Sequence, residues 1–184
     1  MSAWWILLGI IILLVLFVTG MYNGLVKLKN RVKNGLANIE TQLQRRYDLI
    51  PNLIETVKGY AAHEKNVLEQ VTLARTSMNS AGTVKEKAAA DDALSGTLRT
   101  LFAVSENYPQ LKADTNFREL QVELTNTENK ISFARQFYND AVTKFNTDIE
   151  LFPKNIIAGM FGFKQTELFE VLDKASKAAP KVEF

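Results

Sequence analysis

The sequence contains no cysteine, few helix-breaking residues and a single histidine. The absence of cysteine among the 184 residues excludes disulfides, thiolate nucleophiles, thiolate metal sites and a lipid anchor attached through a cysteine. It leaves the redox compartment open. Four prolines and nine glycines favour long helices over a sheet with many turns. A formal net charge of +2 gives no reason, from bulk charge, to expect nucleic acid as a partner.

Charge is also absent from the first part of the chain, over residues 3–22. As a helix this stretch is about 30 Å long, which is the thickness of the hydrocarbon core of a bilayer. Ala3, Trp4 and Trp5 stand at one end, with Gly20 and Tyr22 at the other. Trp and Tyr rings favour the membrane interface. We therefore predict a single transmembrane anchor within residues 1–24, with the lipid bilayer as the partner of residues 3–22.

The main alternative for this stretch is a cleaved signal peptide. Such a peptide has basic residues at its start, a shorter apolar run and small residues at the cleavage site. Here the first basic residue is Lys27, and Val18-Thr19-Gly20 is a poor cleavage site. A retained anchor is favoured. Gly20 and Gly24 also form a GxxxG pattern, which either lets two anchors pack closely or marks a flexible exit from the lipid.

Basic residues follow the apolar stretch closely, namely Lys27, Lys29, Arg31 and Lys33. The positive-inside rule then places the N-terminus outside and the rest of the chain in the cytoplasm. The same residues would also suit a solvated helix face or a patch resting on anionic headgroups.

Beyond the anchor, apolar residues recur every three or four positions, which is typical of a helical stripe. The first stripe comprises Leu25, Leu28, Val32, Leu36, Ile39, Leu43, Ile50, Leu53, Val57, Val67, Val71 and Met78; others run over residues 94–108 and 120–152. No stretch alternates with a period of two. The prediction is an all-α fold, with residues 25–152 forming an antiparallel up-and-down helical bundle.

Pro51 leaves the number of helices open. The stripe keeps its phase across Pro51, which favours one kinked helix over residues 25–78 and a three-helix bundle. Matching the lengths of neighbouring helices favours a turn at residues 46–48 and four helices. We prefer four. The loop at residues 79–83, Pro109 and Pro153 supply the other breaks.

Residues 153–184 form a hydrophobic tail with a polar end. The candidate interface residues of the tail, counted with the residue just before it, are Phe152, Pro153, Phe161, Phe163 and Phe169. We expect the tail to pack as a lid over the open end of the bundle. The alternative is contact with the membrane surface or with another subunit.

Among polar residues, one group suggests a clamp between helices: Arg45, Arg46, Asp48, Glu128, Asn129 and Arg135. Arg45 or Arg46 could pair with Glu128 in a bidentate, partly buried contact that fixes helix register. A ligand or partner site is the alternative. His63 lacks a second imidazole to complete a metal site, and Glu119 with Glu123 suits a solvated helix face. We predict no catalytic, cofactor or metal residues and no small-molecule substrate.

Several short segments along the chain carry a resemblance. They are Tyr22-Asn23, RRYDLIPNL at 45–53, VKGY at 57–60, SENYPQL at 105–111, TENKI at 127–131 and Phe152-Pro153. In this order and spacing the chain resembles the LemA family of bacterial membrane proteins. The resemblance implies a single N-terminal membrane helix and a cytoplasmic helical bundle at the bacterial inner membrane. It implies no particular molecular activity.

Two functional hypotheses follow. The first is a non-enzymatic, membrane-tethered scaffold that presents helical surface to other proteins, including copies of itself. The second is an accessory subunit that binds another membrane protein, such as a protease or a sensor, through the bundle or the tail. Enzymatic activity ranks third, because no catalytic constellation stands out.

Overall fold

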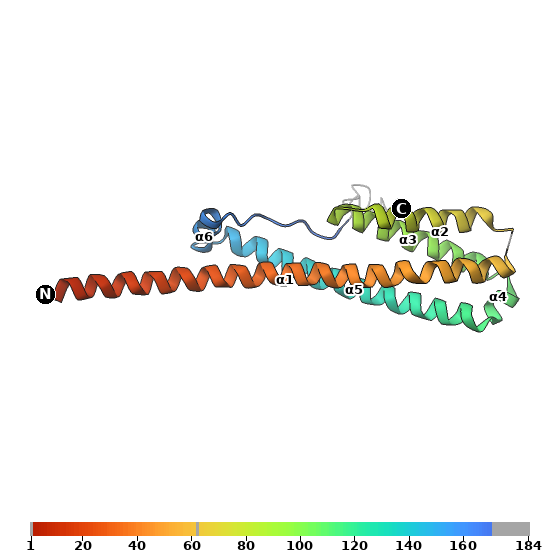
Figure 1. Ribbon diagram of the computed structural model, residues 1–184, viewed down its shortest axis with the longest axis horizontal. Helices are drawn as coiled ribbons and strands as arrows, with labels where there is room; N and C mark the ends of the chain where they lie inside the picture. The colour runs from red at the N-terminus through yellow and green to blue at the C-terminus, as the bar shows by residue number, and fades with distance from the viewer. Residues whose placement is uncertain (1, 62, 171–184) are drawn as a thin grey trace, which may run out of the picture. The chain divides into compact units, whose positions relative to one another are not determined.

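The computed structural model describes residues 2–61 and 63–170, without the side chains of residues 2 and 3 (Figure 1). Every regular element in this part of the chain is a helix, so the all-α prediction is confirmed. The polar end of the tail, residues 171–184, lies outside the described residues. The helices are α1 (Ser2–Tyr60), α2 (Lys65–Ser80), α3 (Val84–Ser105), α4 (Pro109–Ala113), α5 (Thr115–Glu150) and α6 (Lys154–Phe161).

The first part of α1 is apolar on all sides and uncovered. Trp4 is 78% exposed, Phe17 is 57% exposed, and every residue between them is exposed as well. A core helix of a water-soluble protein would bury such side chains. By length and composition, α1 contains an 18-residue window near its start that is apolar enough to cross a membrane. Its exposed hydrophobic surface is what lipid would cover.

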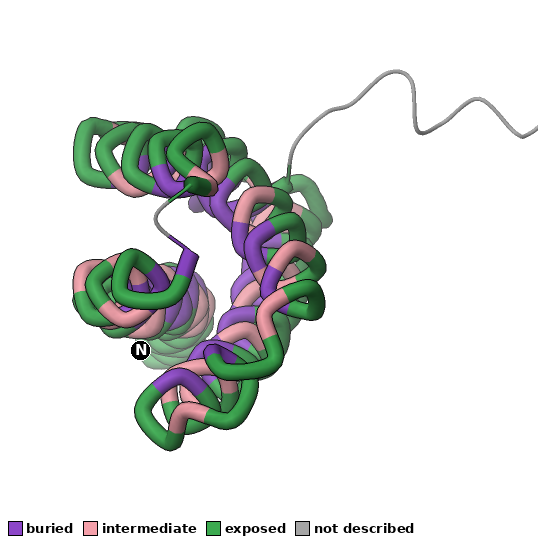
Figure 2. The backbone as a smooth tube through the Cα atoms, turned by 90° about the vertical axis from the view of Figure 1, so that its right-hand side faces the viewer, coloured by how far each residue is buried: buried purple, intermediate pink, exposed green. Residues whose placement is uncertain are grey.

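The chain folds into two compact units. The anchor unit comprises residues 2–44 and 127–168, and contains the N-terminal part of α1, most of α5 and α6. The hairpin unit comprises residues 45–126 with residues 169 and 170, and contains the end of α1, the α2–α3 hairpin, α4 and the start of α5. Buried positions gather on one side of each long helix (Figure 2).

The core of the hairpin unit follows the predicted stripes in part: Leu68 is buried in place of Val67, and Leu111 and Phe117 are buried in addition. α2 and α3 are joined by three residues, and Thr83 caps α3. The amide of Glu86 donates to the Thr83 hydroxyl, and the Glu86 carboxylate accepts from the amide of Thr83. The amide of Gly82 also donates to this carboxylate, and the hydrogen bonds from the amides of Thr83 and Gly82 lower the pKa of Glu86. The buried side chains include Ile50, Leu53, Val57, Leu68, Val71, Met78, Leu94, Leu98, Leu101, Leu111, Phe117 and Leu124.

The predicted turn at residues 46–48 is wrong, because α1 continues through Pro51. Proline has no N–H, so the carbonyl of Tyr47 loses its usual donor four residues later. Arg75 of α2 takes this role: its Nε donates to the Tyr47 carbonyl at 3.3 Å. Its guanidinium also lies 3.8 Å from the centroid of the Tyr47 ring. Two contacts from one side chain thus offset the bond that Pro51 removes.

The chain breaks instead after Tyr60, so a single helix over residues 25–78 is also wrong. Side-chain hydrogen bonds hold this turn. The Tyr60 hydroxyl donates to Asp114 at 2.9 Å, and the Tyr108 hydroxyl donates to Glu64 at 2.8 Å. The hydrogen bond to Asp114 raises the pKa of Tyr60. Both acceptors lie where a neighbouring helix starts, so the turn is tied to residues distant in sequence.

In the anchor unit, α1 and α5 approach each other closely at Gly35. A Cβ at this position would lie 3.2 Å from the Cα of Tyr138. Glycine therefore lets the two backbones pack closer than any other residue would. Tyr138 itself is fully buried, with Ile131, Ala134, Val142 and Phe145 on the same helix.

A double-mutant cycle can test whether the hydrogen bond from Arg75 replaces the backbone hydrogen bond that Pro51 cannot donate to the Tyr47 carbonyl. Arg75→Met should lower the free energy of unfolding by about 1–2 kcal/mol, since it leaves the Tyr47 carbonyl without its donor. In a Pro51→Ala background the restored N–H binds that carbonyl, so the same change should cost much less. Thermal melts of the full chain in detergent, followed by circular dichroism, measure both. Equal losses in the two backgrounds would show that Arg75 does not replace the missing donor.

Candidate functional site

The predicted membrane residues lie along the uncovered start of α1. Trp4 and Trp5 are 78% and 73% exposed, Gly20 is exposed, and Tyr22 is half-buried. Ala3 belongs to α1, although its side chain is outside the described part. A Cβ at Gly20 or Gly24 would meet nothing within 4 Å. In this chain neither glycine is needed for a close contact, so both interpretations of the GxxxG pattern stay predictions.

In the hairpin unit, Arg46 and Asp91 form a buried ion pair. Nη1 of Arg46 lies 2.6 Å from Oδ1 of Asp91, and the side chains are only 3% and 1% exposed. Removing two charges from water is costly, so such a pair requires close, well-directed contacts. The pair joins α1 to α3 and fixes how the two helices align.

Asp91 was missed by the sequence reasoning, although its position carries a signal. It stands three residues before Leu94 and seven before Leu98, and so lies on the apolar stripe of α3. Arg46 likewise lies in phase with Leu43 and Ile50 on α1. A charged residue on an apolar stripe needs a buried partner of opposite charge. One such residue on each of two neighbouring helices would have suggested the pair.

The other clamp residues have different surroundings. Nη2 of Arg45 lies 2.5 Å from Oε2 of Glu123, with both side chains nearly half exposed. Asp48 is exposed on α1, while Glu128, Asn129 and Arg135 lie on the α5 segment of the anchor unit. Pairing of Arg45 or Arg46 with Glu128 stays a prediction.

Glu119 and Glu123 line an open groove of about 690 Å³ in the hairpin unit. Its other lining residues are Pro51, Asn52, Glu55, Thr56, Asn116 and Leu120. In residues 2–61 and 63–170, no three His, Asp or Glu side chains are placed to hold a metal ion. His63 is exposed in the turn after α1. Glu64 beside it accepts the hydrogen bond from Tyr108.

The anchor unit has an aromatic cluster where α1 leaves its apolar stretch. The ring of Tyr22 lies 4.6 Å from that of Phe161 and 5.9 Å from that of Phe163. Phe163 also meets the ring of Phe145 at 6.3 Å, and the Lys29 ammonium lies 5.7 Å from its centroid. The tail thus packs against α1 and α5 beside Tyr22.

Hydrogen bonds from α5 hold the tail after α6. The Asn146 side chain makes two with Thr166, donating to its carbonyl and accepting from its amide, each at 2.9 Å. The Tyr138 hydroxyl donates to the Glu167 carbonyl at 2.8 Å. Phe169, a predicted interface residue, is 2% exposed, and Phe163 is half-buried. These two side chains pack within the protein, whereas Phe152 is 79% exposed.

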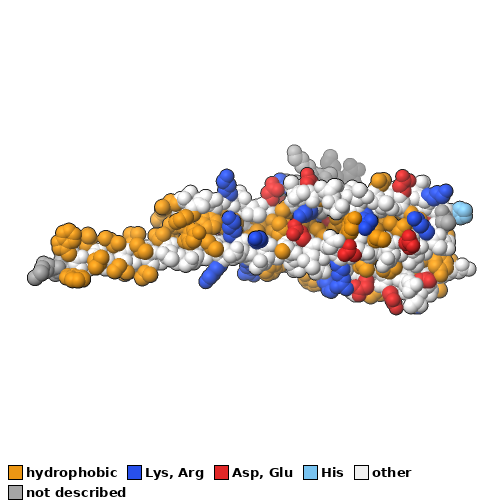
Figure 3. Space-filling model, viewed as in Figure 1, with side chains coloured by type: hydrophobic (Ala, Val, Ile, Leu, Met, Phe, Trp, Pro, Cys, Tyr) orange, Lys and Arg blue, Asp and Glu red, His pale blue; other side chains and the backbone are white. Residues whose placement is uncertain are grey.

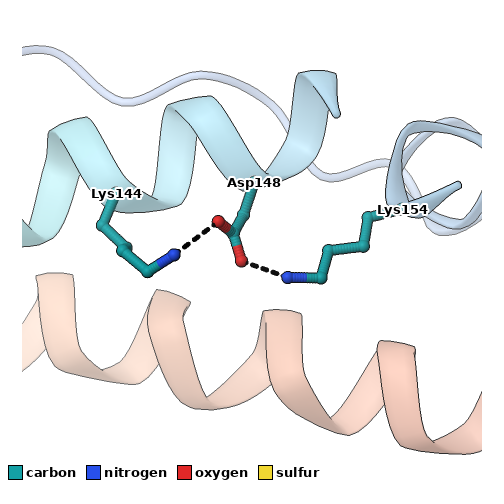
Figure 4. A network of polar contacts seen from close by, with 3 residues as sticks. All are labelled: Lys144, Asp148 and Lys154. Atoms are coloured by element: carbon teal, nitrogen blue, oxygen red, sulfur yellow. Dashed lines mark hydrogen bonds and ion pairs between the residues drawn. The ribbon is translucent and has the colours of Figure 1, made fainter. Parts of the chain in front are cut away.

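A buried carboxylate joins α5 to α6 in the anchor unit. Asp148 is 3% exposed and accepts from the Lys144 ammonium at 2.8 Å and from that of Lys154 (Figure 4). Burial raises the pKa of Asp148, but the hydrogen bonds and charges of the two lysines lower it by more. The net pKa of Asp148 therefore lies below the ordinary value. The cluster carries one net positive charge beside the exposed corner that starts α6.

A second exposed aromatic surface lies on α5. Phe133 is 73% exposed and Phe137, one turn on, is 42% exposed. Together with Asn38, Gln42, Lys130 and Ala134 they line an open groove of about 450 Å³, called here the Phe133 groove. The guanidinium of Arg31 lies 5.1 Å from the centroid of the Phe137 ring. The Oε1 atom of Gln42 is buried and has no hydrogen-bond donor among the described residues.

Comparison with known proteins places these features in a family. The family model described as "LemA family" matches residues 35–184. Magnetosome protein MamQ 2 of Paramagnetospirillum magneticum is 25% identical over 81% of this chain, and the match spans 64% of that protein's own length. Magnetosome protein MamQ of Magnetospirillum gryphiswaldense is 24% identical, over 85% of this chain and 68% of its own. Protein LemA of Metamycoplasma hominis is 25% identical, over 82% and 69%. With the apolar helix, these relatives indicate a membrane-associated protein.

The buried ion pair yields a prediction with a matched control. Arg46→Met should lower the free energy of unfolding by about 3–5 kcal/mol, because Asp91 would stay buried without this partner. Arg45→Met removes the exposed pair with Glu123 and should cost about 0–1 kcal/mol. Adding Asp91→Leu to Arg46→Met should cost less than the sum of the single changes. Thermal melts of the parent and of four variants, namely Arg46→Met, Arg45→Met, Asp91→Leu and the double change at 46 and 91, measure these differences. A loss at Arg46 no larger than that at Arg45 would contradict the structural role of the pair.

Proposed function

This chain belongs to the LemA family, and we propose that it is a non-enzymatic, membrane-tethered scaffold that associates with copies of itself through the anchor unit. The tether is α1, whose residues 4–17 expose hydrophobic side chains on every side. The surface offered to a second copy is the Phe133 groove. The proposal needs no cofactor and no small-molecule substrate.

The exposure of Phe133 and Phe137 is the observation that carries the proposal. Two aromatic side chains one turn apart form an apolar ridge on α5, and aromatic residues are enriched at the centres of protein interfaces. The groove beside the ridge is open, which suits a helix surface better than a small molecule. Polar and basic residues at its edge, including Lys130 and Arg31, resemble the polar rim of an interface.

The Gln42 side chain supports the same surface. Its buried Oε1 atom has lost its water and has gained no donor among the described residues. An unsatisfied buried acceptor costs free energy, and a donor from a partner helix in the groove would recover it. A second copy would bring Asn38, Lys130 and Gln42 itself to such an interface, and the side chains of all three carry donors.

The side of the membrane forms part of the proposal. Lys27, Lys29, Arg31 and Lys33 are all exposed on α1 just beyond the apolar stretch, and no acidic residue precedes Glu40. By the positive-inside rule, these residues support an N-terminus outside, with the chain from residue 27 onward in the cytoplasm of a bacterial cell.

Self-association through the Phe133 groove should be sensitive to one exposed side chain. Phe133→Ser should weaken it about 30-fold, which corresponds to the roughly 2 kcal/mol of an interface hot spot. Leu73→Ser is the matched control, because Leu73 is 60% exposed on α2 of the hairpin unit and should leave association unchanged. Native mass spectrometry and crosslinking in mild detergent over a concentration series give the dissociation constants.

Three results would separate the alternatives. A strict monomer with no retained partner would refute the scaffold. Equal association by the parent and Phe133→Ser proteins would show that the scaffold does not associate through the Phe133 groove. A co-purifying membrane protein that is lost only in the Phe133→Ser variant would favour the accessory-subunit hypothesis.

Orientation can be measured by fusing reporters after Phe184. A fluorescent protein that folds only in the cytoplasm should be bright, and alkaline phosphatase, which is active only outside, should be inactive. Changing all four basic residues at positions 27–33 to Gln should reduce this asymmetry, because the charge bias that retains the chain inside is removed. The opposite pattern in the parent protein would place the units outside.

A further inference from the structure

The corner between α5 and α6 exposes an unusual number of large apolar side chains. We call it the α6 corner: Leu151, Phe152, Ile156, Met160 and Phe161, which are 54%, 79%, 53%, 72% and 54% exposed. Ile156 and Met160 lie one turn apart and so share a face of α6. The other side of this short helix is packed, since Ile157 and Ala158 are buried. α6 therefore has one face against the protein and one apolar face that none of the residues up to 170 covers.

The α6 corner lies level with the end of the predicted membrane span. The Phe161 ring packs against that of Tyr22, with their centroids 4.6 Å apart, and Tyr22 is the last residue of the predicted span, residues 3–22. Both residues belong to the anchor unit, so their placement does not depend on the hairpin unit. Hydrophobic atoms continue from the N-terminal stretch onto the region of α6, and the blue side chains of Lys and Arg begin beyond it (Figure 3).

The length of the uncovered stretch indicates that the hydrocarbon core of the bilayer extends as far as Tyr22. Residues 4–17 are all exposed, and at about 1.5 Å per residue they span roughly 21 Å. The hydrocarbon core is about 30 Å thick, so about six further residues must lie within it. These residues reach Tyr22, where Phe161 packs. A bilayer that covers α1 fully therefore also reaches the α6 corner.

Charge on the same unit fits the headgroup layer just outside. Lys27 and Lys29 follow Tyr22 within about two turns of α1, and Lys29 lies over the Phe163 ring. Lys154 starts α6, and both Lys154 and Lys144 pair with the buried carboxylate of Asp148. Apolar side chains bordered by basic ones are typical of helices that lie at the surface of an anionic bilayer.

We propose that the α6 corner is a second membrane-binding element, which inserts its apolar side chains at the boundary between acyl chains and anionic headgroups beside the exit of α1. It rests on the membrane tether of the proposed function but not on self-association. α6 lies along the interface while α1 crosses the bilayer. The anchor unit thus touches the membrane at two places, one spanning and one superficial.

The lack of native cysteine allows a direct test by site-directed spin labelling. Single substitutions Met160→Cys, Phe152→Cys, Leu14→Cys and Gln136→Cys would be made in the full chain and labelled. Each protein is placed in nanodiscs with equal parts of phosphatidylcholine and phosphatidylglycerol. Collisions of the label with oxygen, which concentrates in lipid, and with a water-soluble nickel complex then report its depth.

Leu14 and Gln136 are the two controls. Leu14 is 59% exposed on the apolar part of α1 and should read as deep. Gln136 is exposed on α5, two residues from Tyr138, which packs on Gly35 about 20 Å beyond Tyr22 along α1. It should read as water-exposed. Met160 and Phe152 should show an oxygen-to-nickel collision ratio severalfold higher than Gln136 and lower than Leu14. In discs of phosphatidylcholine alone this ratio should fall toward the Gln136 value.

Each contrary result has a distinct meaning. Water-like values at Met160 and Phe152 with a deep Leu14 would overturn the α6 proposal and leave the tether intact. A water-like collision ratio at Leu14 would overturn both the α6 proposal and the membrane tether. Spin–spin broadening at Met160 that disappears on mixing with unlabelled protein would assign the corner to contact between copies, and would also overturn the membrane proposal.

Discussion

The continuity of α1 is the constraint on which the rest of the structure depends. Its first part needs lipid on every side, and a few residues later the same helix carries an apolar stripe that needs other helices. The change takes place without a linker: Phe17 is 57% exposed, Leu25 is buried, and Lys27 is the first charge. A helix cannot bend freely between these points, so the folded anchor unit begins at the membrane surface rather than on a flexible tether.

Buried charge sets the alignment of the helices in both units. Leucine, isoleucine and valine on a stripe can slide by a turn at modest cost, but a buried charge has few acceptable partners. In the hairpin unit Arg46 meets Asp91, and in the anchor unit Asp148 is held between two lysines. Register and helix ends are thereby specified by a few polar contacts, while the area of apolar contact supplies most of the stability.

Sequence patterns predicted the helical fold and the apolar start of α1, because both follow from periodicity and length. The end of α1 was not predictable in this way. Pro51 looked like the break, yet its cost is offset by Arg75, a residue on another helix, and the true turn depends on Tyr60 and Tyr108 meeting distant carboxylates. Partners far apart in sequence leave no local signal. The Arg46–Asp91 pair was partly visible, since each charge lies on an apolar stripe.

A second contact with the membrane would change what a single anchor can do. One transmembrane helix leaves a protein free to rotate about the helix axis and to tilt, so a surface on its side faces all directions. If α6 is held among headgroups, the anchor unit can still rotate about the axis of α1, but its tilt is restricted. The Phe133 groove is then kept at one height above the bilayer. Copies confined to one plane with their grooves at the same height meet at a higher effective concentration than freely tumbling ones. Modest contact energy at the exposed ridge of Phe133 and Phe137 would then suffice for association, which agrees with a groove that is open and small rather than extensive.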